Sequence, residues 1–209
     1  MLLAIHADHP EPRKIRRAVE LLADGGVIAY PTDTVYGLGC DLMNKQAIDR
    51  LYAMKGMDRS HPLSFVCPDL SDIARYAVVD NPVYRVLRRF LPGPYTFILQ
   101  ATREVPKLVQ MKRKTVGIRV PSAEIPRALA RELGRPIVSS TASLRSRTGS
   151  DDGSEAPPFV DPHEIHDAFR GLALVLDGGV GGLVPTSIVD LTQTPPQVLR
   201  EGAGPVEEF

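Results

Sequence analysis

The sequence predicts an α/β protein, a single domain with a mixed sheet and flanking helices. Early in the chain, short β-branched runs alternate with stretches whose apolar residues recur at helical spacing. In the last quarter, strand-like runs follow one another, so we expect antiparallel as well as parallel pairs. With 209 residues, 43% hydrophobic and 24% charged, the chain can build one sizeable core. We therefore expect residues 1–209 to form one domain.

The first part of the chain predicts three helices between short strands. Arg13–Ala23 has apolar residues on one side and stops at Gly25. Asn44 is a suitable N-cap for a second helix that continues through Met54. Asn81–Phe90 is a third, because a proline at the second position is tolerated in a first turn. The strands expected here are Leu2–Ile5, Val27–Tyr30 and Leu63–Val66.

The remaining elements are mostly strands. Two helices are expected, at Ile125–Leu133 and from Asp161 to Phe169, each with a proline in its first turn. Residues 142–160 are polar and rich in serine, glycine and proline, so we expect a mobile loop there. The expected strands are Thr96–Ala101, Thr115–Val120, Pro136–Ser140, Leu172–Leu176, Ser187–Leu191 and Gln197–Arg200.

One stretch combines a strand signal with a cluster of small polar side chains. Val27–Tyr30 ends at Pro31, which cannot donate to a sheet ladder. Thr32 to Tyr36 then offer two hydroxyls, a carboxylate and a phenol, while Gly37 and Gly39 allow a close backbone approach. A polar loop at a strand end commonly binds a small ligand in open α/β sheets. An ordinary turn with glycines for shape fits the same residues.

This stretch resembles the signature of a known family. The residues Pro31-Thr32-Asp33-Thr34-Val35-Tyr36-Gly37-Leu38-Gly39 resemble that of the YrdC/YciO family, whose best-known members are threonylcarbamoyl-AMP synthases. Four further blocks in the same order extend the resemblance over most of the chain. They are Phe90-Leu91-Pro92-Gly93-Pro94-Tyr95-Thr96, Val116-Gly117-Ile118-Arg119-Val120-Pro121, Pro185-Thr186-Ser187-Ile188-Val189-Asp190 and Leu199-Arg200-Glu201-Gly202.

The resemblance implies a fold and a chemistry. The fold would be a twisted, mixed open sheet with flanking helices and a large concave basic cleft. The reaction would condense L-threonine, bicarbonate and ATP to threonylcarbamoyl-AMP, with release of pyrophosphate, for tRNA modification. ATP would be a substrate, with Mg²⁺ bound through its phosphates. Positioning would supply most of the rate, so no nucleophile is expected.

Candidate site residues follow by matching each position to a family motif. The catalytic candidates are Lys55 and Arg119, and Arg119 ends its strand, where a guanidinium can hold a carboxylate through two hydrogen bonds. Thr32 would contact threonine, and Arg200 the nucleotide. Surface ion pairs are the alternative for the two arginines. No metal ligand is expected. The other binding candidates are Tyr36, Arg59, Ser139, Thr141, Ser143, Thr186 and Ser187.

Two departures separate the chain from the synthases. Where the synthases carry Lys-x-Arg-Pro, this chain has Lys55-Gly56-Met57-Asp58-Arg59-Ser60-His61-Pro62. Met57 thus replaces the arginine, and Arg59 lies two residues further on. Where the synthases carry Pro-Ser-Ala-Asn, it has Ser140-Thr141-Ala142-Ser143, and Ser143 cannot supply an amide. Both losses argue against full synthase activity and indicate the YciO branch.

Charge is distributed unevenly, although the formal net charge is zero. Residues 1–148 hold 23 Lys and Arg against 14 Asp and Glu. Glu104 is the one acid between Arg85 and Arg119, which suggests a cleft face that binds the phosphates of tRNA or double-stranded RNA. The alternative is that these basic side chains are solvated and do not converge on one surface. The basic residues are Arg85, Arg88, Arg89, Arg103, Lys107, Lys112, Arg113, Lys114 and Arg119.

Two other motifs carry weaker signals. His163-Glu164-Ile165-His166 lacks the spacing of a zinc-protease motif, and we interpret it as the solvated start of a helix. Asp177–Gly182 is glycine-rich and could form a phosphate nest, but it lacks the lysine of a P-loop. We therefore interpret it as a flexible connection between strands near the site.

Three classes of function stay open: an enzyme that forms threonylcarbamoyl-AMP or acts on it, an RNA-binding protein with a vestigial nucleotide cleft, and a nucleotide-binding regulator. No apolar run approaches the roughly 18–20 residues of a membrane span. We expect a cytoplasmic protein that is a monomer or weak dimer.

Overall fold

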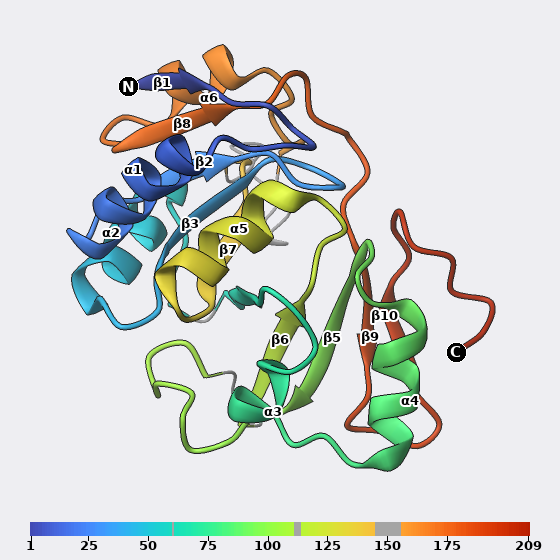
Figure 1. Cartoon of the computed structure of the whole chain (residues 1–209). Helices are drawn as coiled ribbons and strands as arrows, with labels where there is room; N and C mark the ends of the chain where they lie inside the picture. Colours follow the sequence, from blue (N-terminus) through green and yellow to red (C-terminus); the bar gives the residue numbers. More distant parts are fainter. Residues whose placement is uncertain (60, 111–113, 145–155) are drawn as a thin grey trace.

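A computed structural model of the chain describes residues 1–59, 61–110, 114–144 and 156–209. Its strands form one ten-stranded sheet in the order β1-β8-β2-β3-β7-β4-β6-β5-β9-β10 (Figure 1). The pairs β1/β8, β2/β8, β4/β6 and β5/β9 are parallel, and the other pairs are antiparallel. The predicted mixed open sheet is therefore confirmed. Its strands are β1 (Leu2–Ala4), β2 (Ile28–Tyr30), β3 (Gly37–Asp41), β4 (Ser64–Val66), β5 (Tyr95–Gln100), β6 (Thr115–Arg119), β7 (Ile137–Thr141), β8 (Leu174–Asp177), β9 (Ser187–Asp190) and β10 (Gln197–Arg200).

The five predicted helices are confirmed, with ends that differ by a residue or two. A one-turn helix, α3, was not predicted, because four residues are too few to show helical spacing. In the described part of the chain, no helix is both long and apolar enough to cross a membrane. The helices are α1 (Pro12–Ala23), α2 (Lys45–Lys55), α3 (Ile73–Tyr76), α4 (Asn81–Phe90), α5 (Glu124–Leu133) and α6 (Pro162–Ala168).

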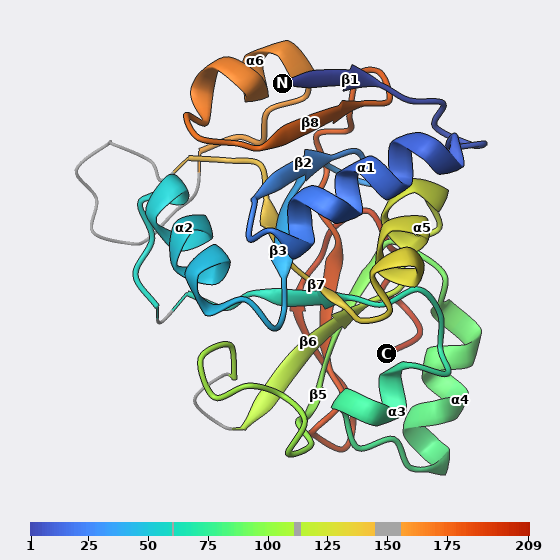
Figure 2. The same ribbon diagram turned by 60° about the vertical axis from the view of Figure 1, so that its left-hand side comes forward.

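The helices cover the two faces of the sheet unequally. On one face, α1 and α5 pack against each other and against β2, β7 and β8, and Figure 2 shows these two helices side by side in front of the strands. On the other face, the larger core includes residues of α2, α4 and α6. Because strand side chains alternate, Thr96 and Ile98 of β5 point away from this larger core, which takes Tyr95 and Phe97. Thr96 and Ile98 instead line a cavity.

The glycine-rich end of the signature stretch forms strand β3 and not a loop. Gly37–Asp41 pairs with β2 on one side and β7 on the other, and all five residues are buried. Two glycines in five positions lower strand propensity, and burial on both faces removes the usual alternation. The predicted loop at 142–160 lies partly outside the described residues, and residues 156–160 belong to no helix or strand.

The basic run does not form one surface over the described residues. Helix α4 carries Arg85, Arg88 and Arg89, and it packs on the Tyr95 side of β5 through a ring contact between Phe90 and Tyr95. Arg119 lies on the other side of the sheet, in the cavity. The expected shared face of these arginines is therefore wrong, because positions close in sequence lie on opposite faces. Lys112 and Arg113 lie outside the described residues.

Candidate functional site

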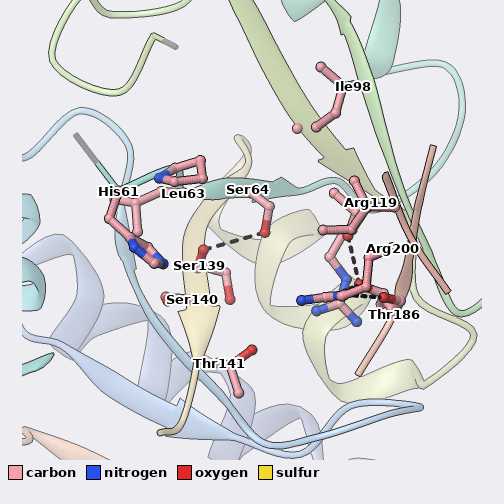
Figure 3. Close-up of a pocket in the computed structure, with 14 residues that line it drawn as sticks. His61, Leu63, Ser64, Ile98, Arg119, Ser139, Ser140, Thr141, Thr186 and Arg200 are labelled. Atoms are coloured by element: carbon pink, nitrogen blue, oxygen red, sulfur yellow. Dashed lines mark hydrogen bonds between the residues drawn. The ribbon is translucent and has the colours of Figure 1, made fainter. Parts of the chain in front are cut away.

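A cavity of about 410 Å³ lies against the part of the sheet that α1 and α5 do not cover. It is here called the polar chamber. A volume of this size is typical of a small-ligand site. Figure 3 shows side chains from β4, β6, β7 and β10 pointing into it. Its cations are Arg119 and Arg200, and its hydroxyl-bearing residues are Ser64, Thr96, Ser139, Ser140, Thr141 and Thr186.

A second cavity of about 400 Å³ adjoins the first and is here called the apolar chamber. The two cavities share His61, Pro62, Leu63, Ile98 and Ile188, so they form one continuous cleft. The rest of its lining combines the polar residues Arg59, Gln110, Thr115 and Asp190 with four apolar or aromatic side chains from α2, β10 and the loop after β5. These are Tyr52, Leu108, Val109 and Leu199.

Arg119 is the buried cation of the polar chamber. Its Nη2 donates to Thr34 Oγ1 at 3.2 Å and lies 3.5 Å from Asp33 Oδ1. Its Nε is buried and has no hydrogen-bond partner among the described residues. Burial lowers the pKa of Arg119, while Asp33 and Tyr30 raise it, and an arginine stays protonated in proteins. The guanidinium thus lines the cavity as a cation held in place by the protein.

The loop of residues 31–36, here called the signature loop, contacts the Arg119 guanidinium and fixes its position. Asp33 Oδ2 accepts hydrogen bonds from the backbone and the hydroxyl of Ser122, at 2.8 and 3.1 Å. Thr32 Oγ1 donates to the carbonyl of Val35, so its hydroxyl closes the turn, and it is not among the residues that line either chamber. Thr34, which was not a candidate, is the threonine that contacts Arg119. Sequence alone does not show which hydroxyl closes the turn.

Arg200 reaches the polar chamber from the edge strand β10. Its Nε donates to the carbonyl of Thr186 at 3.0 Å, and its Nη2 to Thr186 Oγ1 at 3.2 Å, as Figure 3 shows. Thr186 Oγ1 also lies 2.9 Å from Thr96 Oγ1. Ser187, also a candidate, points elsewhere: its hydroxyl donates to the carbonyl of Gly204 and accepts from the amide of Gly202. Ser187 therefore anchors the C-terminal segment.

Lys55 supports the end of strand β7, which forms one wall of the polar chamber. Its Nζ donates to Ser140 Oγ at 2.8 Å, to the carbonyl of Thr141 at 2.7 Å and to Ser143 Oγ at 3.3 Å. Lys55 and Ser143 are both fully buried and line neither chamber, whereas Ser140 and Thr141 line the polar one. The ammonium thus holds the end of β7 in place.

Replacing Lys55 with methionine is expected to lower the free energy of unfolding by about 3 kcal/mol, because buried acceptors that lose a partner cost roughly 1–3 kcal/mol each. Urea unfolding measures the loss. Lys45→Met is the matched control, since Lys45 is exposed at the start of the same helix. Equal stabilities of the two variants would contradict a supporting role for Lys55.

Met57, at the position of the synthase arginine, and Arg59, two residues further on, both lie outside the polar chamber. Met57 packs against the larger hydrophobic core. Arg59 lines the apolar chamber, and its Nη2 bonds Asp49 Oδ1 at 2.6 Å. No described side chain of this segment therefore brings a guanidinium to the polar chamber.

The glycine-rich segment at 177–182 closes over the signature loop and does not form a phosphate nest. The amide of Gly178 donates to Tyr36 Oη, and that of Gly179 to Asp177 Oδ1. The amide of Gly181 donates to the carbonyl of Val160, and that of Gly182 to the carbonyl of Thr34. Tyr36 in turn donates to the carbonyl of Gly179 at 2.7 Å. Tyr36 is thus a clamp on this segment, and it lines neither chamber. Near His163, α6 begins at Pro162, and Asp161 caps it, as expected for a helix start.

Comparison with known proteins shows the family. Residues 20–202 match the Sua5/YciO/YrdC domain, described as "Telomere recombination". The chain is 43% identical to YciO of Escherichia coli K12 over 207 residues, which cover 98% of this chain and 97% of that protein. It therefore belongs to the Sua5/YciO/YrdC family.

Solved structures agree. The crystal structure of E. coli YciO superimposes with a TM-score of 0.89 at 40% identity and covers 100% of this chain and 98% of its own. Sua5 of Pyrococcus abyssi, solved with L-threonine, gives a TM-score of 0.88 at 29% identity over 100% of this chain and 59% of that one. The P. abyssi threonylcarbamoyl-AMP synthase is 30% identical over 95% of this chain and 57% of its own length.

Proposed function

We propose that the protein is a threonylcarbamoyl-AMP synthase-like enzyme. It binds L-threonine and ATP in the cleft and forms threonylcarbamoyl-AMP, or acts on it, in tRNA modification. The observation that carries the proposal is Arg119, a buried cation that lines a chamber whose other lining residues include six with hydroxyls. The similarity to Sua5 solved with L-threonine supports it.

Arg119 would hold the carboxylate of threonine. A guanidinium offers a planar fork that matches a carboxylate, and burial excludes the water that competes for it. Asp33 and Thr34 fix the fork from the loop side, so little motion would be lost on binding. The hydroxyls of β7 would then lie near the amino end, where bicarbonate is taken up.

The nucleotide would span both chambers. Arg200 and Thr186 supply donors for its phosphates at the polar end, and the apolar chamber offers a surface for the base. No Asp or Glu is among the described residues that line the polar chamber, so Mg²⁺ would be held chiefly by the phosphates themselves. The metal would neutralise the charge that develops as pyrophosphate leaves.

The departures at Met57 and Ser143 point to lower synthase activity than in the enzymes the chain resembles. Met57 lies in the core, and Ser143 is bonded to Lys55. Neither position thus supplies the guanidinium or the amide that the synthase motifs carry. Action on threonylcarbamoyl-AMP itself, which needs no triphosphate, is the form of the proposal that these positions favour.

Incubation with L-threonine, bicarbonate, Mg²⁺ and ATP tests the proposal. We expect the adenylate to form, detected by mass spectrometry, and pyrophosphate to appear only when both threonine and bicarbonate are present. A second arm adds preformed threonylcarbamoyl-AMP and follows its consumption. ATP binding without either conversion would identify a nucleotide-binding regulator, and an absence of binding would contradict the proposal.

The geometry separates RNA binding from the cleft. Arg85 and Arg88 are exposed on α4, on the opposite side of the sheet from Arg119. Phosphate contacts by α4 would therefore not compete with a ligand in the cleft.

Charge reversal of Arg85 and Arg88 to glutamate is expected to change ATP and threonine affinity by less than about twofold, because exposed charges beyond about 8 Å are largely screened at physiological salt. Calorimetry measures both affinities, and a salt titration of tRNA binding measures any contribution of α4. A tenfold loss of ATP affinity would show that α4 acts on the cleft.

A further inference from the structure

Tyr30 is a fully buried phenol beside the polar chamber. It ends β2 and packs in the core beneath α1 and α5. Its hydroxyl donates to Ser139 Oγ at 2.7 Å. Burial raises the pKa of Tyr30 to about 12, so the phenol keeps its proton at physiological pH and stays a donor.

Two glycines of β3 make room for this ring. Residues 37 and 39 face the same side of the strand, because side chains alternate. A Cβ at Gly37 would lie 3.2 Å from both Ser139 Oγ and Tyr30 Cζ, and a Cβ at Gly39 would lie 2.8 Å from Tyr30 Cε1. A larger residue at either position would displace the ring. The glycines of the signature therefore allow the Tyr30 hydroxyl to reach Ser139.

Ser139 lines the polar chamber from the middle of β7. A serine hydroxyl has one proton to donate and lone pairs that accept. Tyr30 occupies an acceptor position of Ser139 Oγ, and no hydrogen bond from this hydroxyl to an acceptor is found among the described residues. Its proton is thus directed away from Tyr30 and is available to a ligand.

We propose that Tyr30 is a positioning residue that fixes the Ser139 hydroxyl as a donor to an anionic oxygen at the inner wall of the polar chamber. The oxygen belongs to a carboxylate or a phosphate, so this inference rests on the proposed function for the identity of its ligand. Arg119, on the neighbouring part of the wall, is also a donor without acceptors. The wall therefore selects oxyanions over neutral analogues.

The test is a double-mutant cycle of Tyr30→Phe and Ser139→Ala. Calorimetry measures affinity for L-threonine, L-threoninamide, ATP, adenosine and inorganic pyrophosphate. For an anionic probe, we expect Ser139→Ala to weaken binding by about tenfold and Tyr30→Phe by about three- to fivefold. The double variant should match Ser139→Ala within about twofold, because one hydroxyl acts through the other. L-Threoninamide and adenosine should bind the variants as they bind the wild type.

Tyr95→Phe is the matched control. It removes a phenol that donates to the carbonyl of Pro205 at 3.0 Å on the opposite side of the sheet. This variant should bind every probe as the wild type does. Ser139→Thr keeps a hydroxyl and should keep the preference for anions, so the comparison of Ser139→Thr with Ser139→Ala decides the role of Ser139 even if Tyr30→Phe does not fold.

The outcomes separate this inference from the proposed function. Additive losses, equal losses for charged and neutral probes, or unchanged affinity in Ser139→Ala would overturn the inference and leave threonine and ATP binding intact. Coupled losses seen with pyrophosphate alone would support the inference and overturn the threonine chemistry. A wild type that binds none of the anions would overturn both.

Discussion

Replacing Arg119 with glutamine is expected to weaken L-threonine binding by about a hundredfold. Removing one partner of a buried charged hydrogen bond costs roughly 2–5 kcal/mol, and every 1.4 kcal/mol is tenfold in affinity. Arg119 lines the polar chamber, and Asp33 and Thr34 hold its guanidinium in place, so a carboxylate there would gain a charge-assisted bond to a fixed cation. Calorimetry with L-threonine measures the loss.

A half-buried arginine that forms an ion pair of its own provides the control. Arg135 bonds Asp41 at the end of β3 through Nε and Nη2, at 2.7 and 2.5 Å, and neither residue lines a chamber. Arg135→Gln should lower stability, because it also removes a charge from an acidic partner, yet leave threonine affinity unchanged. If Arg119→Gln folds and binds threonine as tightly as Arg135→Gln, the carboxylate site lies elsewhere.

The elements that are bounded by clear turn or capping residues were predictable from the sequence. Strand β10 has the predicted bounds, Gln197–Arg200, and β6 and β9 end one residue early. Strand β3 could not be predicted, because Gly37 and Gly39 have no side chain to show a pattern. Their place in the sheet depends on the ring of Tyr30, the residue of the adjacent strand β2 that pairs with Gly37.

The two arginines that line the polar chamber were predictable from the sequence, whereas the hydroxyl-bearing residues that line it were less so. Arg119 and Arg200 end strands, and strand ends meet at one edge of the cleft. The choice between Thr32 and Thr34, and between Thr186 and Ser187, depends on which hydroxyl closes a turn or holds a distant segment. That choice is made by backbone geometry, which residue types alone do not specify. For the same reason, the basic run could not be divided between the two faces.

Replacing Arg200 with alanine is expected to weaken ATP binding by about ten- to a hundredfold, because a hydrogen bond to a charged group contributes roughly 1.5–3 kcal/mol. Thr186 holds the guanidinium at two points and aims it at the polar chamber. Strand β10 is exposed along its length, so the substitution should change stability by less than about 0.5 kcal/mol. The loss of affinity would therefore report on the ligand and not on folding.

Two further variants make the Arg200 prediction specific. Thr186→Val keeps the carbonyl that holds Nε and removes Oγ1, which Nη2 bonds at 3.2 Å, so a smaller loss of about three- to fivefold is expected. Arg103→Ala removes an exposed arginine that lines neither chamber and should leave ATP affinity unchanged. Threonine affinity should stay constant in all three, because Arg119 is untouched. An Arg200→Ala protein that binds ATP like Arg103→Ala would place the phosphates away from β10, and a parallel loss of threonine affinity would show that Arg200 shapes the whole chamber.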